Sequence, residues 1–74
     1  MKNELHAQTA KAFGDKIEAF DKDVQKLYTF EVESFLNRLD ASLTRLYDNS
    51  CLSVQDFQRL DTMLLRRREK YVFA

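Results

Sequence analysis

The sequence has few of the residues that interrupt helices or build small fixed sites. Its 74 residues include one glycine, one cysteine and one histidine, and no proline or tryptophan. This composition excludes collagen-like chains and Pro/Gly-rich disordered chains, and it favours long helices. Because 45% of the residues are hydrophobic, general disorder is not expected either. We predict a single all-α domain over residues 1–74.

The sparse cysteine and histidine also exclude several kinds of site. Cys51 has no partner for a disulfide, which favours a reducing, cytoplasmic location. His6 and Cys51 cannot supply the four or so ligands of a zinc site, and no glycine-rich phosphate loop is present. We therefore expect no cofactor, no metal and no enzymatic activity. No apolar run approaches the roughly 18 residues of a membrane span, and the N-terminus lacks the apolar core of a signal peptide, so no membrane partner is expected.

Apolar residues recur with helical spacing through much of the chain. The first series steps by 4, 3, 4 and 3, as in a coiled-coil seam, and consists of Phe13, Ile17, Phe20, Val24 and Leu27. A second series is shifted in phase by one residue and consists of Tyr28, Val32, Phe35, Leu39, Leu43 and Leu46. Phe30 lies off both series. The spacing predicts one long helix over residues 15–47.

Gly14 leaves two interpretations of the N-terminal region open. Glycine suits the left-handed position that closes a helix, and Asp15 followed by Glu18 has the spacing of a capping box that starts a new one. Residues 3–13 would then form a short separate helix. Alternatively, one helix continues through Gly14 at a cost of about 1 kcal/mol.

The clearest boundary lies at residues 48–53, where Asp, Asn and Ser side chains favour a turn. Ser53 and Asp56 have capping-box spacing, and Leu52 and Phe57 occupy the positions of a hydrophobic staple. We therefore predict a second helix over residues 53–72.

These two helices would form a hairpin with unequal arms. When folded back, the roughly 20-residue second helix covers only about residues 28–47 of the first. The seam before them would form an exposed apolar patch, which an antiparallel homodimer would bury. We therefore predict a helical hairpin that associates into an antiparallel dimeric bundle or coiled coil. The residues expected at the self-association or partner interface are Phe13, Ile17, Phe20, Val24, Leu27, Tyr28 and Phe30.

Charge is balanced overall, with 12 basic and 12 acidic side chains, which argues against a general polyanion binder. A basic cluster nevertheless stands near the C-terminus and consists of Arg66, Arg67, Arg68 and Lys70. It has three interpretations: it stabilises the C-terminal dipole of its helix, binds nucleic acid through phosphate contacts and stacking, or binds an acidic partner protein.

The last residues are apolar where chain ends are usually frayed. Tyr71, Val72 and Phe73 would either pack on the dimer or serve as a short anchor for a partner.

Together these features favour a non-enzymatic protein-interaction module, such as a small adaptor, inhibitor or chaperone-like regulator. Its expected partners are a second copy of itself and another protein. The alternative is a nucleic-acid-binding regulator that uses the Arg66–Lys70 face.

Overall fold

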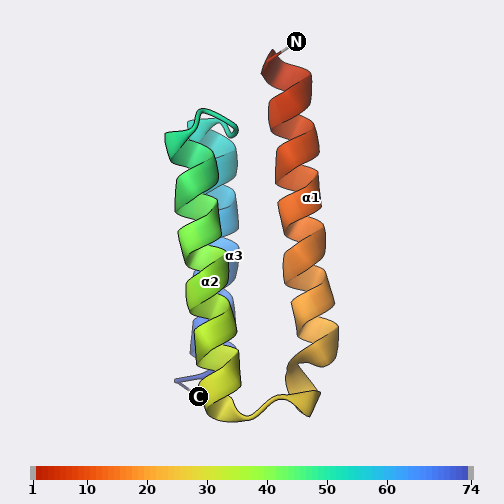
Figure 1. The fold of residues 1–74 in the computed structure, drawn as a ribbon, viewed down its shortest axis with the longest axis vertical. Helices are drawn as coiled ribbons and strands as arrows, with labels where there is room; N and C mark the ends of the chain where they lie inside the picture. Colours follow the sequence, from red (N-terminus) through yellow and green to blue (C-terminus); the bar gives the residue numbers. More distant parts are fainter. Residues whose placement is uncertain (1, 74) are drawn as a thin grey trace.

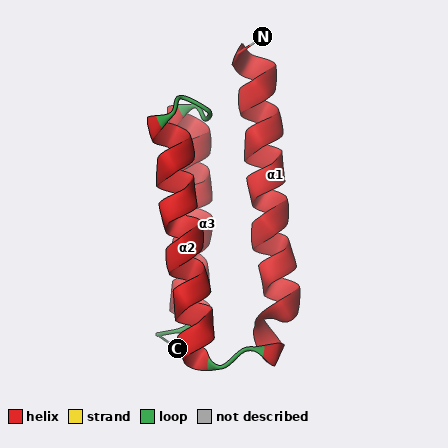
Figure 2. Cartoon of the chain, in the orientation of Figure 1, coloured by secondary structure: helices red, strands yellow, loops and turns green. Residues whose placement is uncertain are grey.

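The computed structural model describes residues 2–73, with side chains from residue 4 onward. Three α-helices and one short 3-10 turn follow each other in the order α1 (Lys2–Asp23), η1 (Val24–Lys26), α2 (Thr29–Asp48) and α3 (Val54–Tyr71). α1 and α2 run antiparallel, and α3 returns beside α2 (Figure 1). Short loops join the helices, and no strand occurs among the described residues (Figure 2). The all-α prediction is confirmed, as a bundle that measures 40 × 18 × 15 Å.

Helix α1 continues through Gly14, so the separate helix predicted over residues 3–13 is wrong. The glycine has no positive φ angle and therefore does not act as a helix terminator. The apolar residues on either side of it, Phe13 and Ile17, are both buried on the same face of α1. Burial of two large side chains is worth several kcal/mol, which exceeds the roughly 1 kcal/mol that glycine costs inside a helix.

The chain reverses instead between Val24 and Thr29, so the long helix predicted over residues 15–47 is also wrong. Leu27 and Tyr28 adopt extended backbone angles, with ψ of 146° and 157°. This is the place where the apolar phase slips by one residue. In one continuous helix, that slip would rotate the second apolar stripe by about 100° away from the first. A reversal at this point lets both stripes face one core.

The second reversal lies where it was predicted. At the end of α2, the Cys51 N–H donates to the carbonyl of Leu46 at 2.9 Å and the Ser50 N–H donates to that of Tyr47 at 3.0 Å. These are the two bonds of a Schellman motif, in which Ser50 occupies the left-handed position with φ of 61°. Ser53 then caps α3, because its Oγ accepts from the Asp56 N–H at 3.1 Å. The second helix predicted over residues 53–72 is confirmed as α3.

All three helices contribute to a single core. The buried side chains are Ala10, Phe13, Ile17 and Phe20 from α1, Val32, Leu36, Leu39 and Leu43 from α2, Leu52 from the second loop, and Leu60 and Leu64 from α3. The first half of the predicted seam is therefore covered within the chain. The expectation that this seam lacks intramolecular cover is wrong, because a three-helix bundle replaces the two-helix hairpin. The dimer remains a prediction, but this seam no longer requires one.

Candidate protein-interaction surface

The structure divides the seven predicted interface residues into an inner and an outer group. Phe13, Ile17 and Phe20 are buried in the core and cannot contact another chain directly in this conformation. Val24 and Leu27 are half-buried and pack against the core from the first connection. The remaining two, Tyr28 and Phe30, are the most exposed of the set, at 72% and 69%. Only the connection between α1 and α2 therefore presents the predicted apolar residues to solvent.

The two exposed aromatic residues lie together rather than apart. Tyr28 is the residue before α2 and Phe30 lies in the first turn of that helix. Their rings are nearly parallel, with centroids 6.0 Å apart and an interplanar angle of 6°. Stacking of this kind organises both rings into one apolar plate. The Tyr28 backbone is held in place because its N–H donates to Glu31 Oε1 at 3.0 Å. This bond satisfies a backbone donor at the start of α2 that has no partner within the helix.

A third aromatic residue, Phe35, extends this plate along α2. Its ring stacks on the buried Phe20 ring of α1 with centroids 5.1 Å apart, while 40% of the residue stays exposed. The sequence pattern predicted Phe35 as a seam residue, but the core position next to it belongs to Leu36. The spacing of Val32, Leu36, Leu39 and Leu43, by 4, 3 and 4, was the signal that could have shown this. We call Leu27, Tyr28, Phe30 and Phe35 the corner surface.

Two hollows flank Phe35 and make the corner surface concave. One has a volume of about 260 Å³ and lies between α1 and α2, where it is lined by Lys16, Ala19, Phe20, Asp23, Leu27 and Phe35. The other has a volume of about 300 Å³ and is lined by Leu27, Phe30, Glu31, Ser34, Phe35 and Arg38. Leu27 and Phe35 border both hollows, so the two are parts of one continuous surface. Its apolar centre and charged edge are the arrangement found in protein interfaces.

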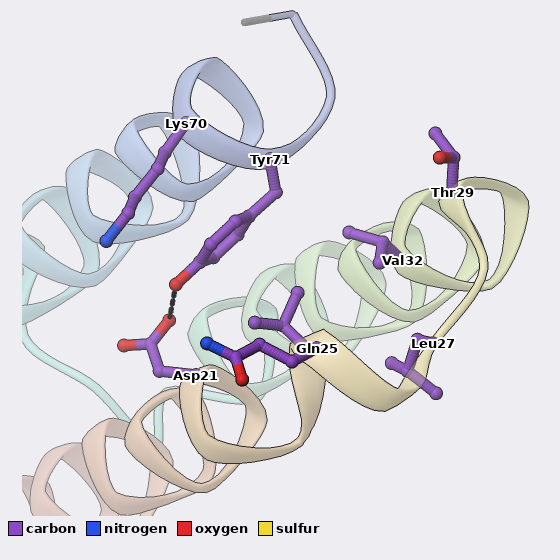
Figure 3. Close-up of a pocket in the computed structure, with 8 residues that line it drawn as sticks. Asp21, Gln25, Leu27, Thr29, Val32, Lys70 and Tyr71 are labelled. Atoms are coloured by element: carbon purple, nitrogen blue, oxygen red, sulfur yellow. Dashed lines mark hydrogen bonds between the residues drawn. The ribbon is translucent and has the colours of Figure 1, made fainter.

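A larger hollow of about 510 Å³ lies at the end of the bundle where α1 ends, α2 begins and α3 ends. Figure 3 shows the Tyr71 side chain extending from α3 to Asp21, and Lys70 and Gln25 also line this hollow. The Tyr71 hydroxyl donates to Asp21 Oδ1 at 3.0 Å. Burial raises the pKa of the Tyr71 phenol above its usual value of 10, and the hydrogen bond to Asp21 raises it further. The bond between Tyr71 and Asp21 holds α1 against α3 at this end of the bundle.

Two of the four cations in the basic cluster of α3 form ion pairs within the chain. Arg67 donates to both carboxylate oxygens of Asp21, at 2.8 and 3.3 Å, in the two-pronged geometry that makes strong ion pairs. Arg68 donates to Asp40 at 3.2 Å and to Asn37 at 2.8 Å. These two arginines tie α3 to α1 and to α2.

The exposed remainder of the basic cluster is small. Arg66 and Lys70 face solvent, and the Lys70 amine lies 5.3 Å from the centre of the Tyr71 ring. The predicted face for nucleic acid or an acidic partner therefore retains two of its four cations, because Arg67 and Arg68 are paired.

The predicted C-terminal anchor is also divided. Tyr71 is half-buried and packs its ring edge against Phe20, with centroids 5.9 Å apart. Val72 is half-buried against the core. Phe73 is 71% exposed and is the one member of this group that the fold leaves at the surface.

His6 and Cys51, which are too few to form a zinc site, both lie near the second connection. The His6 ring nitrogen Nε2 lies 3.0 Å from the Ser50 carbonyl oxygen, which joins α1 to this loop. Cys51 is half-buried, and its thiol lies 3.7 Å from the Asn49 carbonyl oxygen. Between residues 2 and 73, no group of three or more His, Cys, Asp or Glu residues could hold a metal ion.

Comparison of the chain with known protein families, curated proteins and solved structures gives no match. Within the part of the chain that the structure describes, no helix is both long and apolar enough to cross a membrane. A functional assignment therefore depends on the geometry of the surface itself.

Proposed function

We propose that this chain is a non-enzymatic protein-interaction module that binds another protein chain through the corner surface. The observation that carries the proposal is the stacked, exposed pair of Tyr28 and Phe30 beside the partly exposed Phe35. Burial of one such side chain is worth about 1.5–3 kcal/mol, so leaving the rings of Tyr28 and Phe30 mostly in water forgoes considerable stability. Aromatic residues are enriched among the few side chains that dominate protein binding.

The shape and charge of the surface support the same proposal. The hollows on either side of Phe35 provide room for side chains of a partner, and pockets of this kind accept the anchor residues of an interface. The charged groups lie at the edge, where they can select a partner without being buried at high cost. A lone cysteine suits a reducing compartment, so the proposal includes action in the cytoplasm.

Binding of nucleic acid is less well supported as a function. Two exposed cations, Arg66 and Lys70, remain from the basic cluster after Arg67 and Arg68 pair with carboxylates of the chain. Because non-specific affinity grows with the number of phosphates that cations contact, a cluster with two exposed cations offers little. A salt-dependent complex with DNA or RNA that is lost in an Arg66→Ala, Lys70→Ala variant would reverse this ranking.

The proposed function is tested by capture with matched variants. A tagged chain is used to retain proteins from cells that also express an untagged copy, and the retained proteins are quantified by mass spectrometry. The variants are Tyr28→Ser with Phe30→Ser, and Leu65→Ser as the control, since Leu65 is an exposed apolar residue on α3 outside the corner surface. We expect a specific protein to be retained by the wild type and the control and lost with the double variant. Retention that does not depend on Tyr28 and Phe30 would contradict the proposal.

A further inference from the structure

Four charged residues frame the corner surface in a repeated pattern. On α1, Lys16 and Asp23 line the same hollow, and on α2, Glu31 and Arg38 line the other. In each helix the two opposite charges are seven residues apart, which is two turns or about 10 Å. None of the four forms an ion pair within the described part of the chain. Each helix therefore presents, on the face that lines the corner surface, one cation and one carboxylate without an ion-pair partner, although Glu31 also accepts the Tyr28 N–H.

The stacked rings of Phe20 and Phe35 bring the charged pair of α1 and the charged pair of α2 to the same level of the bundle. Phe20 lies near the midpoint between Lys16 and Asp23, and Phe35 lies near the midpoint between Glu31 and Arg38. Since the ring centroids are 5.1 Å apart, the two midpoints are at the same level of the bundle. The helices run antiparallel (Figure 1). Both cations therefore lie on one side of the ring pair, and both carboxylates lie on the other.

We propose that the partner of the corner surface is a second copy of this chain, packed face to face with its helices antiparallel to those of the first. The inference rests on the proposed function and identifies its partner. A twofold axis perpendicular to the helices and close to the Phe20–Phe35 pair exchanges the cation side for the carboxylate side. Lys16 then lies opposite Asp23 of the second copy, and Arg38 lies opposite its Glu31. Twofold symmetry repeats each pair, so the interface contains four complementary pairs.

The charges also exclude the other face-to-face arrangement with twofold symmetry. An axis parallel to the helices would place Lys16 opposite Arg38 of the second copy and carboxylates opposite carboxylates. Like charges placed together across an interface select against that pairing. With this distribution of charge, the corner surfaces of two copies are complementary only when their helices are antiparallel.

The centre of the proposed interface suits close contact. Ala19 and Ser34 are small residues at the level of the ring pair, each lining one of the hollows, and small side chains let helices approach. Phe35, 40% exposed, lies beside the axis and would meet its own symmetry mate. The buried seam of Phe13, Ile17 and Phe20 takes no part, so this dimer differs from the one predicted from the sequence.

The inference is tested by exchanging the charges on α1. We would measure self-association by sedimentation equilibrium from about 1 µM to 1 mM for the wild type, Lys16→Asp, and the exchange variant with both Lys16→Asp and Asp23→Lys. The single variant places carboxylates opposite carboxylates twice per dimer and should weaken association about tenfold. The exchange variant restores opposite charges and should return the dissociation constant to within about threefold of the wild type.

Two controls separate this effect from a change in fold. Lys11→Asp makes the same charge change on the side of α1 that faces α3 and should leave association unchanged. Circular dichroism of each variant should show wild-type helix content, since Lys16 is exposed. Arg38→Glu provides a second, independent disruption on α2 and should act like Lys16→Asp.

Three outcomes would overturn the inference: a wild-type chain that stays monomeric at every concentration, a Lys16→Asp variant that dimerises normally, or an exchange variant that does not recover. The proposed function fails differently. A monomeric chain that still retains another protein through Tyr28 and Phe30 refutes the second copy as partner and keeps the function. A dimer that forms equally well without Tyr28, Phe30 and Phe35 refutes the corner surface itself.

Discussion

The two connections of this bundle solve the same problem, a reversal between antiparallel helices, in opposite ways. The second, between α2 and α3, satisfies its backbone groups locally with a Schellman motif and the Ser53 cap, and it buries Leu52 to 3% exposure. The first, between α1 and α2, passes through extended residues and leaves Tyr28 and Phe30 in solvent.

The contrast agrees with the proposal that the first connection serves binding, whereas the second connection stabilises the fold. A loop selected for stability alone would place its apolar side chains inside, as the second connection does with Leu52. The first connection packs Val24 and Leu27 against the core but directs Tyr28 and Phe30 outward. Its backbone is held locally by the bond from the Tyr28 N–H to Glu31. Arg67 and Tyr71 of α3 both bind Asp21 and so fix the end of α1 that leads into it.

The largest expected difference between the connections is in the effect of truncating an apolar side chain. Leu52→Ala should lower the free energy of unfolding by about 2–4 kcal/mol, because it leaves a cavity beside the core. Phe30→Ala should change it by less than about 0.5 kcal/mol, because the ring is mostly in solvent. Urea unfolding followed by circular dichroism, at concentrations low enough to avoid association, measures both. Equal losses would show that the first connection is also structural.

A smaller change in the free energy of unfolding is expected when glycine replaces Ser50. Ser50 occupies a left-handed conformation that costs an L-residue about 1 kcal/mol, whereas the one glycine, Gly14, lies inside a helix. Ser50→Gly should therefore raise the free energy of unfolding by about 0.5–1 kcal/mol. Thermal unfolding gives this value, and Ser50→Ala, which should bring no gain, is the matched control. A gain in the alanine variant would contradict the assigned conformation.

The smallest effect concerns pH and acts where α3 contacts the end of α1, next to the first connection. The pKa of Tyr71 is raised in the folded chain, mainly by burial and then by Asp21, so the folded state holds this proton more tightly than the unfolded state. The stabilisation is fully present below the usual tyrosine pKa of 10 and is lost as pH rises through the raised value.

The alkaline loss should be smaller in Tyr71→Phe than in the wild type. Urea unfolding at a series of pH values above 10 compares the two chains, and the other tyrosines and lysines contribute equally to both. A wild type and a variant with the same alkaline slope would show that folding does not raise the pKa of Tyr71.

Sequence reasoning succeeded where a signal is local. The second connection and α3 follow from short side chains that bond nearby backbone, such as Ser53 to the Asp56 N–H. The apolar spacing of Phe13, Ile17 and Phe20 identified the buried stripe of α1. Phe30 lies off both apolar series, and the structure places it with Tyr28 at the surface.

Sequence reasoning failed where two local features of the sequence indicated a helix boundary about equally well. Gly14 with Asp15 resembled a helix boundary more than the Leu27–Tyr28 phase slip did, yet the chain reverses at the slip. The choice between Phe35 and Leu36 as the core residue also depends on the position of α1. The pairing of Arg67 with Asp21 joins residues 46 positions apart, so no local pattern contains it.

The sequence by itself determined that the chain is helical, that Ser53 caps the start of α3 and which stripe of α1 is apolar, because these depend on interactions within a few residues. Only the tertiary structure decided that three helices rather than two share the core. It also decided which aromatic residues face outward and which arginines are paired. The reason is energetic: local signals contribute about 1 kcal/mol each, whereas burial of several large side chains contributes more and depends on every helix being in place.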